Sequence, residues 1–299
     1  MTHDGNLPRP PDRLRTMRLT VALLLVGGVT ACGSGEESTV SGRDGQWETY
    51  TSDIDGLAVG YPAAWHRAEV PLVGVMAGDQ FEVLGLATGP LPGSEVACSP
   101  RPWAAMRALG AGDLVLTLRV SVSEGPFDEW SEMGREPLAS KPDDLLGQEA
   151  TPSGELPGGC TVDGVVQRQV DFIAHGRLYT AFLAHSGNLS EQRREELSAV
   201  WSSLTLHPIP TGDESATVGE RYWHVLYTHC GITGTQFAGS EWVAEPVLDD
   251  PRPSWGGPFQ LGVMTLTSPN QAEFESRDGA LKAKFRPRTP ADPPTPPCE

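Results

Sequence analysis

Alternation of apolar and polar side chains predicts several strands in the first half of the chain. Residues 57–61 read LAVGY and residues 113–122 read DLVLTLRVSV, and both have the two-residue period of a half-buried strand. The clearest hairpin is predicted over 164–185, where VVQRQVDFIA and RLYTAFLAH flank the pair His175-Gly176. These segments predict an antiparallel sheet.

The pattern changes to a helical period directly after this hairpin. Asn188 and Glu191 have the spacing of a capping box at a helix start. The apolar residues that follow lie on one helix face at positions i, i+3, i+4 and i+7, namely Leu197, Val200, Trp201 and Leu204. Trp201 is therefore expected in the core. Residues 47–207 are predicted to form one α+β domain that mixes strands and helices.

The last 79 residues carry strand patterns only. Strands are predicted over 222–228, 236–244 and 259–267, and a hairpin over 272–285 around Asp278-Gly279, a pair suited to a type I′ turn. Residues 208–220 have the composition of a linker. The prediction for 221–299 is a small all-β barrel or sandwich with a proline-rich tail.

The N-terminal segment resembles a bacterial lipoprotein signal. Arginines precede an apolar run at 19–29, and the sequence Val-Thr-Ala then leads to Cys32. A run of about 11 residues is too short to span a membrane, which needs about 20. The resemblance implies a signal peptide at 1–31, starting from Met1 or Met17, and a diacylglyceryl group on Cys32. We expect a tether at 32–46 and a location on the outer face of the cell membrane.

The net charge limits the classes of partner, and the composition indicates the kind of source organism. Only three of the 22 basic residues are lysine, which together with abundant Gly and Pro is typical of an actinobacterium with a GC-rich genome. Removing residues 1–31 leaves 18 basic and 37 acidic side chains, a net charge of −19. A surface this acidic disfavours nucleic acid as a partner, because phosphates need clustered Lys and Arg.

Four cysteines remain once Cys32 is assigned to lipid. In an oxidising compartment they predict two disulfides, with three possible connectivities. The linker divides them into two local pairs, so we predict Cys98–Cys160 and Cys230–Cys298.

Two stretches of the chain resemble known domains. GLAVGYPAAWHR, GRLYTAFLAHS and LSAVWSSLTLHP resemble the PsbP-like fold of many bacterial lipoproteins. This resemblance implies an antiparallel sheet covered by helices and a role as an adaptor or ligand binder, with no catalytic residue to carry over. YTHCGI, WVAEP and SWGGPFQLGVMTL resemble a small domain at the C-termini of actinobacterial secreted proteins, to which no activity attaches.

The candidate chemical sites are few. His224, His229 and Cys230 could offer metal ligands, but the two histidines would face opposite sides of a regular strand. Asp53 to Gly56 resembles only the opening of a calcium loop, so a plain turn is expected. We therefore expect no metal and no cofactor.

Three tryptophans of the C-terminal unit are the candidate binding residues, since indoles stack on sugars and anchor protein partners. They are Trp223, Trp242 and above all Trp255, which lies in the loop sequence SWGGP. The expected function is a non-catalytic binding or adaptor role towards an envelope protein or a hydrophobic or glycan ligand. One alternative is a hydrolase of cell-wall polymer or peptide using His185, Ser186 or His229, and another is a purely structural protein.

Overall fold

The computed structural model describes residues 47–69, 71–72, 80–92, 101–121, 140–150, 162–212, 214–228, 231–248, 259–277 and 279–292. The described residues all belong to one compact unit. Among them, no helix is both long and apolar enough to cross a membrane.

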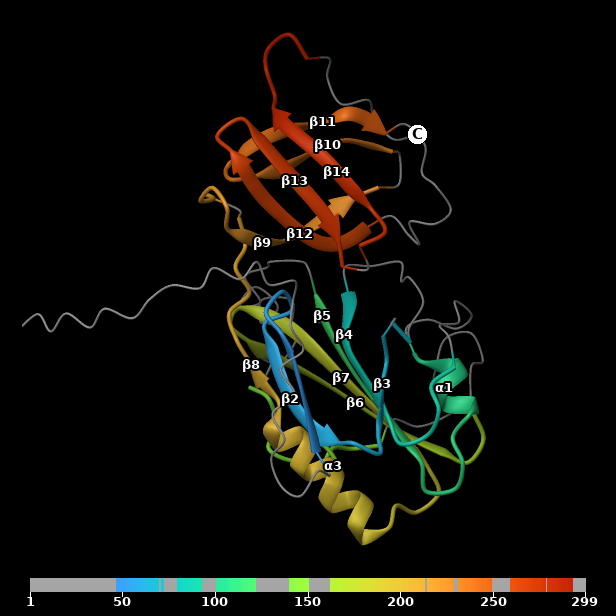
Figure 1. Cartoon of the computed structure of the whole chain (residues 1–299). Helices are drawn as coiled ribbons and strands as arrows, with labels where there is room; N and C mark the ends of the chain where they lie inside the picture. Colours follow the sequence, from blue (N-terminus) through green and yellow to red (C-terminus); the bar gives the residue numbers. More distant parts are fainter. Residues whose placement is uncertain are drawn as a thin grey trace, which may run out of the picture. The chain divides into compact units, whose positions relative to one another are not determined.

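Two antiparallel sheets make up the part of the chain before residue 207 (Figure 1). The smaller sheet contains β1 (Trp47–Ser52), β2 (Leu57–Pro62) and β8 (Thr205–Leu206), in that order. The larger sheet has the order β3 (His66–Arg67), β4 (Gln80–Ala87), β5 (Leu114–Ser121), β7 (Arg177–Ser186) and β6 (Val165–Ala174).

The predicted hairpin of β6 and β7 is confirmed. The strands pair without a shift from Val165 opposite Ser186 to Ala174 opposite Arg177. His175 and Gly176 form the turn with φ values of 51° and 74°. Positive φ at both central residues is the requirement of a type I′ turn, whose twist matches that of the flanking strands.

One long helix, α3 (Glu191–Ser203), follows this hairpin, and the predicted apolar face is confirmed. Leu197, Val200 and Trp201 are buried. The predicted helix start is wrong by two residues: the N-cap is Ser190, whose hydroxyl accepts a hydrogen bond from the Arg193 backbone N–H at 3.2 Å. The hydroxyl of a residue directly before the first turn reaches this N–H more readily than the Asn188 amide does.

The expectation of an α+β fold with covering helices is wrong. In the described residues, antiparallel strands predominate and the helices are limited to α3 and the five-residue α1 (Trp103–Arg107). The core explains the difference, because β2 contributes Leu57 and Val59 to the same apolar cluster as Trp201 of α3 and Leu116 of β5. The small sheet and a single helix thus cover the face for which a helical layer was expected.

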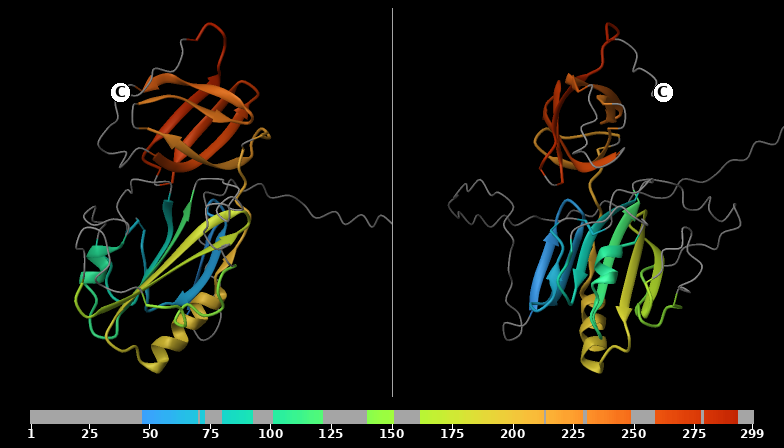
Figure 2. Two further views of the ribbon diagram at one scale, coloured as in Figure 1. Left: turned by 180° about the vertical axis from the view of Figure 1, so that it is seen from behind. Right: turned by 90° about the vertical axis from the view of Figure 1, so that its right-hand side faces the viewer.

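The C-terminal strands form one six-stranded antiparallel sheet, which curves strongly (Figure 2). Its order is β10 (Ile232–Phe237), β11 (Ser240–Leu248), β14 (Lys282–Pro287), β13 (Gln271–Ser276), β12 (Phe259–Ser268) and β9 (Arg221–Tyr227). The prediction of an all-β unit agrees with this sheet. The hydrophobic core of this sheet contains Phe237, Trp242, Met264, Phe274 and Phe285.

One predicted strand of this unit is wrong. Residues 236–244 were expected to be continuous, but β10 ends at Phe237 and β11 begins at Ser240. Between them Ala238 and Gly239 have φ values of 52° and 69°, so the chain reverses in a tight turn. Gly239 is a turn residue, but an alanine rarely adopts a positive φ, so the pair Ala238-Gly239 did not resemble the usual type I′ pairs.

The segment predicted as a linker makes backbone hydrogen bonds to the six-stranded sheet. Pro210 accepts from the Trp223 N–H at 2.7 Å, and Gly219 donates to Leu266 at 2.8 Å. Residue 211 also forms a parallel bridge with Trp223. Residues 208–220 therefore continue into the C-terminal sheet, apart from residue 213, which lies outside the described residues.

Candidate binding site

The five-stranded sheet has one face in the main core and a second face with a different character. On β5, Leu114, Leu116 and Leu118 belong to the main core, whereas Val115 packs with Trp103 and Met106 of α1. Because side chains alternate along a strand, Thr117 and Arg119 lie on the same face as Val115. We call this the outer face. The residues Arg101, Thr117, Arg119 and Gln167 form what we call the sheet-face cluster.

Arg101 is a buried cation at this face. Its side chain is only 7% exposed, although it lies just before α1. One guanidinium nitrogen donates to the Gln167 side-chain oxygen, and the guanidinium carbon lies 5.1 Å from the centre of the Phe182 ring. No carboxylate of the described residues forms an ion pair with it. Burial lowers the pKa of Arg101, since it penalises the charged form.

Two neutral polar side chains of the cluster have unused hydrogen-bonding atoms. Gln167 is 1% exposed and Thr117 is 0% exposed. Within the described part of the chain, neither Nε2 of Gln167 nor the Thr117 hydroxyl finds a hydrogen-bond partner. Thr117 lies opposite Phe182 in the β5–β7 ladder, beside the ring that Arg101 covers. Such atoms are rare in buried positions.

Arg119, by contrast, has acidic neighbours. It lies opposite both Glu82 and Thr180 in the ladders, and Thr180 donates to an Asp171 oxygen at 2.6 Å. Burial lowers the pKa of Arg119, the Asp171 and Glu82 carboxylates oppose this shift, and Arg101 adds to it. The charge of Arg119 is thus balanced within its own row of the sheet.

An ion pair with a buried carboxylate lies beside β4 of this sheet. Arg277, which follows β13, contacts Asp55 with an N–O distance of 2.8 Å. The same guanidinium donates to the backbone carbonyls of Glu82 and Val83, where a bulge interrupts the pairing of β4. Arg277 thereby supplies donors to carbonyls that an irregular ladder leaves without regular partners.

Asp55 belongs to the turn that was compared with a calcium loop. It is 1% exposed and accepts a hydrogen bond from the Ser52 hydroxyl at 2.8 Å. Its other oxygen, Oδ1, has no partner in the described residues. Burial raises the pKa of Asp55, while Arg277 and Ser52 oppose the shift. In the described ranges, no three His, Cys, Asp or Glu side chains are grouped so that they could hold a metal ion.

The structure gives two of the proposed hydrolase residues, His185 and Ser186, separate hydrogen-bond partners. His185 Nδ1 lies 3.1 Å from the Gly187 carbonyl, and Nε2 lies 2.9 Å from an Arg168 nitrogen. These partners assign the proton to Nδ1, so Nε2 accepts from the guanidinium. The Ser186 hydroxyl donates to the Gly110 carbonyl instead of to this imidazole. His229 lies outside the described residues.

Two of the three candidate tryptophans are buried. Trp223 is 5% exposed, and the Arg177 guanidinium carbon lies 4.4 Å from the centre of its ring. Trp242 is 4% exposed and donates its indole N–H to the Phe237 carbonyl at 2.8 Å. Both side chains are therefore packing residues in this conformation. His224, a candidate metal ligand, lies between Phe237 and Phe274 and forms a hydrogen bond with Thr235 at 2.8 Å.

The remaining predicted site residues lie outside the described residues and stay predictions. They are Cys32 for lipidation, the disulfide pairs Cys98–Cys160 and Cys230–Cys298, and Trp255 for binding.

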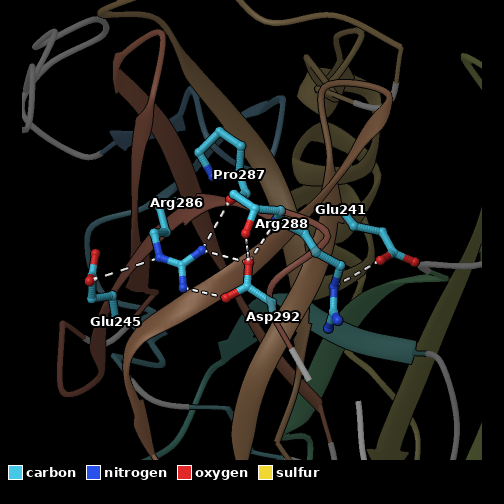
Figure 3. Close-up of polar contacts among 7 residues, drawn as sticks. Glu241, Glu245, Arg286, Pro287, Arg288 and Asp292 are labelled. Atoms are coloured by element: carbon cyan, nitrogen blue, oxygen red, sulfur yellow. Dashed lines mark hydrogen bonds and ion pairs between the residues drawn. The ribbon is translucent and has the colours of Figure 1, made fainter. Parts of the chain in front are cut away.

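An exposed polar cluster closes the turn after β14 (Figure 3). Arg286 binds both carboxylate oxygens of Asp292, at 2.5 and 2.8 Å. The Thr289 backbone N–H and hydroxyl also donate to Asp292. These hydrogen bonds hold the pKa of Asp292 well below its usual range. Both carboxylate oxygens of Asp292 have partners within the protein, so we assign this cluster a structural role.

Sequence reasoning missed the residues of the sheet-face cluster. The alternation on β5 did place Thr117 and Arg119 on one face, but it predicted that this face was exposed to solvent. Arg101 lies outside any periodic segment and carries no sequence signal.

The comparisons with known proteins provide no relative. No protein-family model matches the chain, and no curated protein matches it closely enough to count as related. The functional argument is therefore based on the geometry of this molecule.

Proposed function

We propose that this protein is a lipid-anchored, extracytoplasmic binding protein without catalytic activity, and that it holds its ligand at the sheet-face cluster. The observation that carries the proposal is a pair of polar atoms, on Gln167 and Thr117, that have no partner among the described residues and are fully buried on one sheet face. Each such group costs about 1–3 kcal/mol when it is left without a hydrogen bond. A ligand that supplies the missing partners recovers this free energy on binding.

This arrangement favours binding over a purely structural role. A buried polar network that is only partly satisfied is less stable than an apolar core of the same shape. A structural protein gains nothing from such groups, whereas a binding protein uses them to recognise its ligand. The burial of Arg101, Thr117 and Gln167 also favours a small molecule over the flat face of a protein partner, because such a face contacts mainly exposed side chains.

The geometry around His185 favours the non-catalytic class over the hydrolase. A general base has to accept the proton of its nucleophile at hydrogen-bond distance. His185 Nε2 instead faces Arg168, and Ser186 is hydrogen-bonded to Gly110.

The anchor is tested by a substitution at Cys32. In the wild-type host, the full-length chain is expected in the membrane fraction and should incorporate labelled palmitate. Cys32→Ser should abolish the label and move the protein out of this fraction, because a protein without its acyl chains loses stable attachment. Equal membrane retention of both chains would contradict the anchor.

Binding is tested on the full-length protein extracted from host membranes in a mild neutral detergent. Native mass spectrometry should show a small molecule retained by the wild type and lost from Gln167→Leu. Gln169→Leu is the matched control, since Gln169 lies two residues away on the same strand and its side chain is exposed. Identical spectra for wild type and Gln167→Leu would contradict binding at this site.

A further inference from the structure

We infer that the sheet-face cluster binds a singly charged oxyanion, a carboxylate or a phosphodiester, with Arg101 as its counter-ion. This inference rests on the proposed binding function and names the ligand class for the same site.

The buried positive charge of Arg101 favours an anionic ligand. A buried charge is costly unless a charge of opposite sign accompanies it. Arg101 is 7% exposed, yet its contacts are a neutral amide and an aromatic ring. Arginine keeps its proton even when buried, and its planar fork matches the two oxygens of a carboxylate or phosphate. An anion from outside the chain would complete this site.

The cluster atoms that have no partner in the described residues can act as hydrogen-bond donors. Gln167 already accepts from Arg101 through its side-chain oxygen, so the atom left over is Nε2, which can only donate. The Thr117 hydroxyl can also donate. The remaining N–H groups of Arg101 are donors as well. A site composed of donors selects a ligand rich in acceptors, and an oxyanion has acceptors on every exposed oxygen.

The charges around the cluster fit a ligand that carries a single negative charge. Arg119 is balanced by Glu82 and Asp171, which leaves Arg101 as the uncompensated cation of the cluster. A second negative charge on the ligand would have no counter-ion and would be repelled by these two carboxylates. Carboxylates and phosphodiesters carry one charge at neutral pH, whereas sulfate carries two.

The experiment compares small ligands of matched size on the full-length protein in neutral detergent, at constant ionic strength. Saturation-transfer NMR and thermal unfolding measure binding of butanoate, diethyl phosphate, sulfate and butanamide. Butanoate or diethyl phosphate should bind about tenfold or more tightly than sulfate and butanamide, since a hydrogen bond to a charged group contributes about 1.5–3 kcal/mol. Dihexanoyl phosphatidylglycerol, tested in the same way, distinguishes a lipid headgroup from a free anion.

The decisive variant is Arg101→Met, which removes the charge and keeps the length of the side chain. Binding of the monoanion should weaken about tenfold or more, with Arg101→Lys in between, because lysine keeps the charge but lacks the fork. Arg107→Met is the matched control, as Arg107 is an exposed arginine of α1. Thermal unfolding of Arg101→Met without ligand is measured as well, because the loss of the donor to the Gln167 oxygen costs stability; a variant that still unfolds cooperatively has lost binding and not folding.

Three results would overturn the oxyanion assignment: unchanged monoanion binding in Arg101→Met, equal or tighter binding of sulfate, or equal or tighter binding of butanamide. If butanamide binds and Gln167→Leu abolishes this binding, the protein still binds at the cluster but does not select an anion. If none of the ligands binds and native mass spectrometry finds no retained molecule, the proposed binding function is wrong as well.

Discussion

Single residues show how differently this protein handles its buried charges. Asp55 is matched by Arg277, and Arg119 is balanced by two carboxylates, but within the described residues the contacts of Arg101 are neutral. Buried ionisable groups contribute little to stability even when they are paired, so stability alone does not explain their presence. For Arg101 we propose that the explanation is the binding of an anionic ligand.

A glycine in β12 lies where no larger residue fits. A Cβ at position 262 would overlap the Glu275 carbonyl oxygen and lie 2.6 Å from the Phe274 ring. Gly262→Ala is therefore expected to lower the free energy of unfolding by about 1–3 kcal/mol, the usual cost of overpacking. Gly60→Ala is the control, because its Cβ would have its nearest neighbour at 3.5 Å, an ordinary contact. Urea unfolding should therefore separate the two variants, and equal midpoints would contradict the tight fit at position 262.

His185 should make stability depend on pH near neutrality. Burial lowers its pKa below 6.5; the Gly187 carbonyl opposes this shift, and Arg168 and Arg194 add to it. The unfolded chain then binds more protons, so the stabilisation by neutral His185 is present above about pH 6.5 and is lost as pH falls through the folded-state pKa. Asp55 acts in the opposite direction, since a raised pKa favours the fold at lower pH.

The contribution of His185 is isolated by His185→Asn, which cannot be protonated in this range. Between about pH 7.5 and 5.5, the wild type should lose more unfolding free energy than the variant, as measured by urea titration at both values. If both proteins lose the same amount, His185 is not held neutral by the fold.

At the scale of elements, the start of α3 is determined by one hydroxyl. Ser190 accepts from the Arg193 N–H, whereas the expected cap, Asn188, lies two residues too early. Ser190→Ala should cost about 1 kcal/mol of stability, a typical value for the loss of an N-cap. Asn188→Ala should have little effect, and the two variants can be compared by thermal unfolding. A larger loss in Asn188→Ala would restore the capping box that the sequence suggested.

The bulge of β4 is the element through which distant parts of the chain meet. Its backbone carbonyls accept from Arg277, and the side chain of Glu82, in the same bulge, lies in the row of Arg119. Glu82 also accepts from the Leu72 backbone N–H at 2.9 Å. The β4 bulge thus contacts Arg277, which pairs with Asp55, and also Arg119 at the edge of the proposed ligand site.

At the scale of the whole molecule, the pair of Asp55 and Arg277 joins residues that are more than 200 positions apart in the chain. Arg277→Met should reduce the free energy of unfolding by about 3 kcal/mol or more, since it leaves the buried Asp55 charge without its counter-ion. Asp55→Asn should cost less, because it removes a charge that burial already disfavours.

The double variant Asp55→Asn/Arg277→Met tests the coupling. Its loss of stability should be smaller than the sum of the two single losses, because each single change already breaks the same pair. Denaturant unfolding of the four proteins completes the cycle. Additive losses would show that the two side chains do not interact in solution.

Local patterns in the sequence predicted much of the secondary structure. The hairpin of β6 and β7, the strand β5 and the buried face of α3 were all predicted, because side-chain periodicity and a His-Gly turn act over a few residues. The break at Ala238 was missed, since it depends on a positive φ that an alanine does not signal.

Only the tertiary structure decided the layers and the site. Whether the second face of a strand meets water or protein depends on segments far away in the chain, so the alternation on β5 could not show that Thr117 and Arg119 are buried. The wrong expectation of covering helices came from the resemblance to the PsbP-like fold, and the small sheet packs where they were expected. By itself the sequence determined the local strands and the apolar helix face, and it predicted the lipid anchor. The meeting of Arg101 with Gln167, across 66 positions, required the fold.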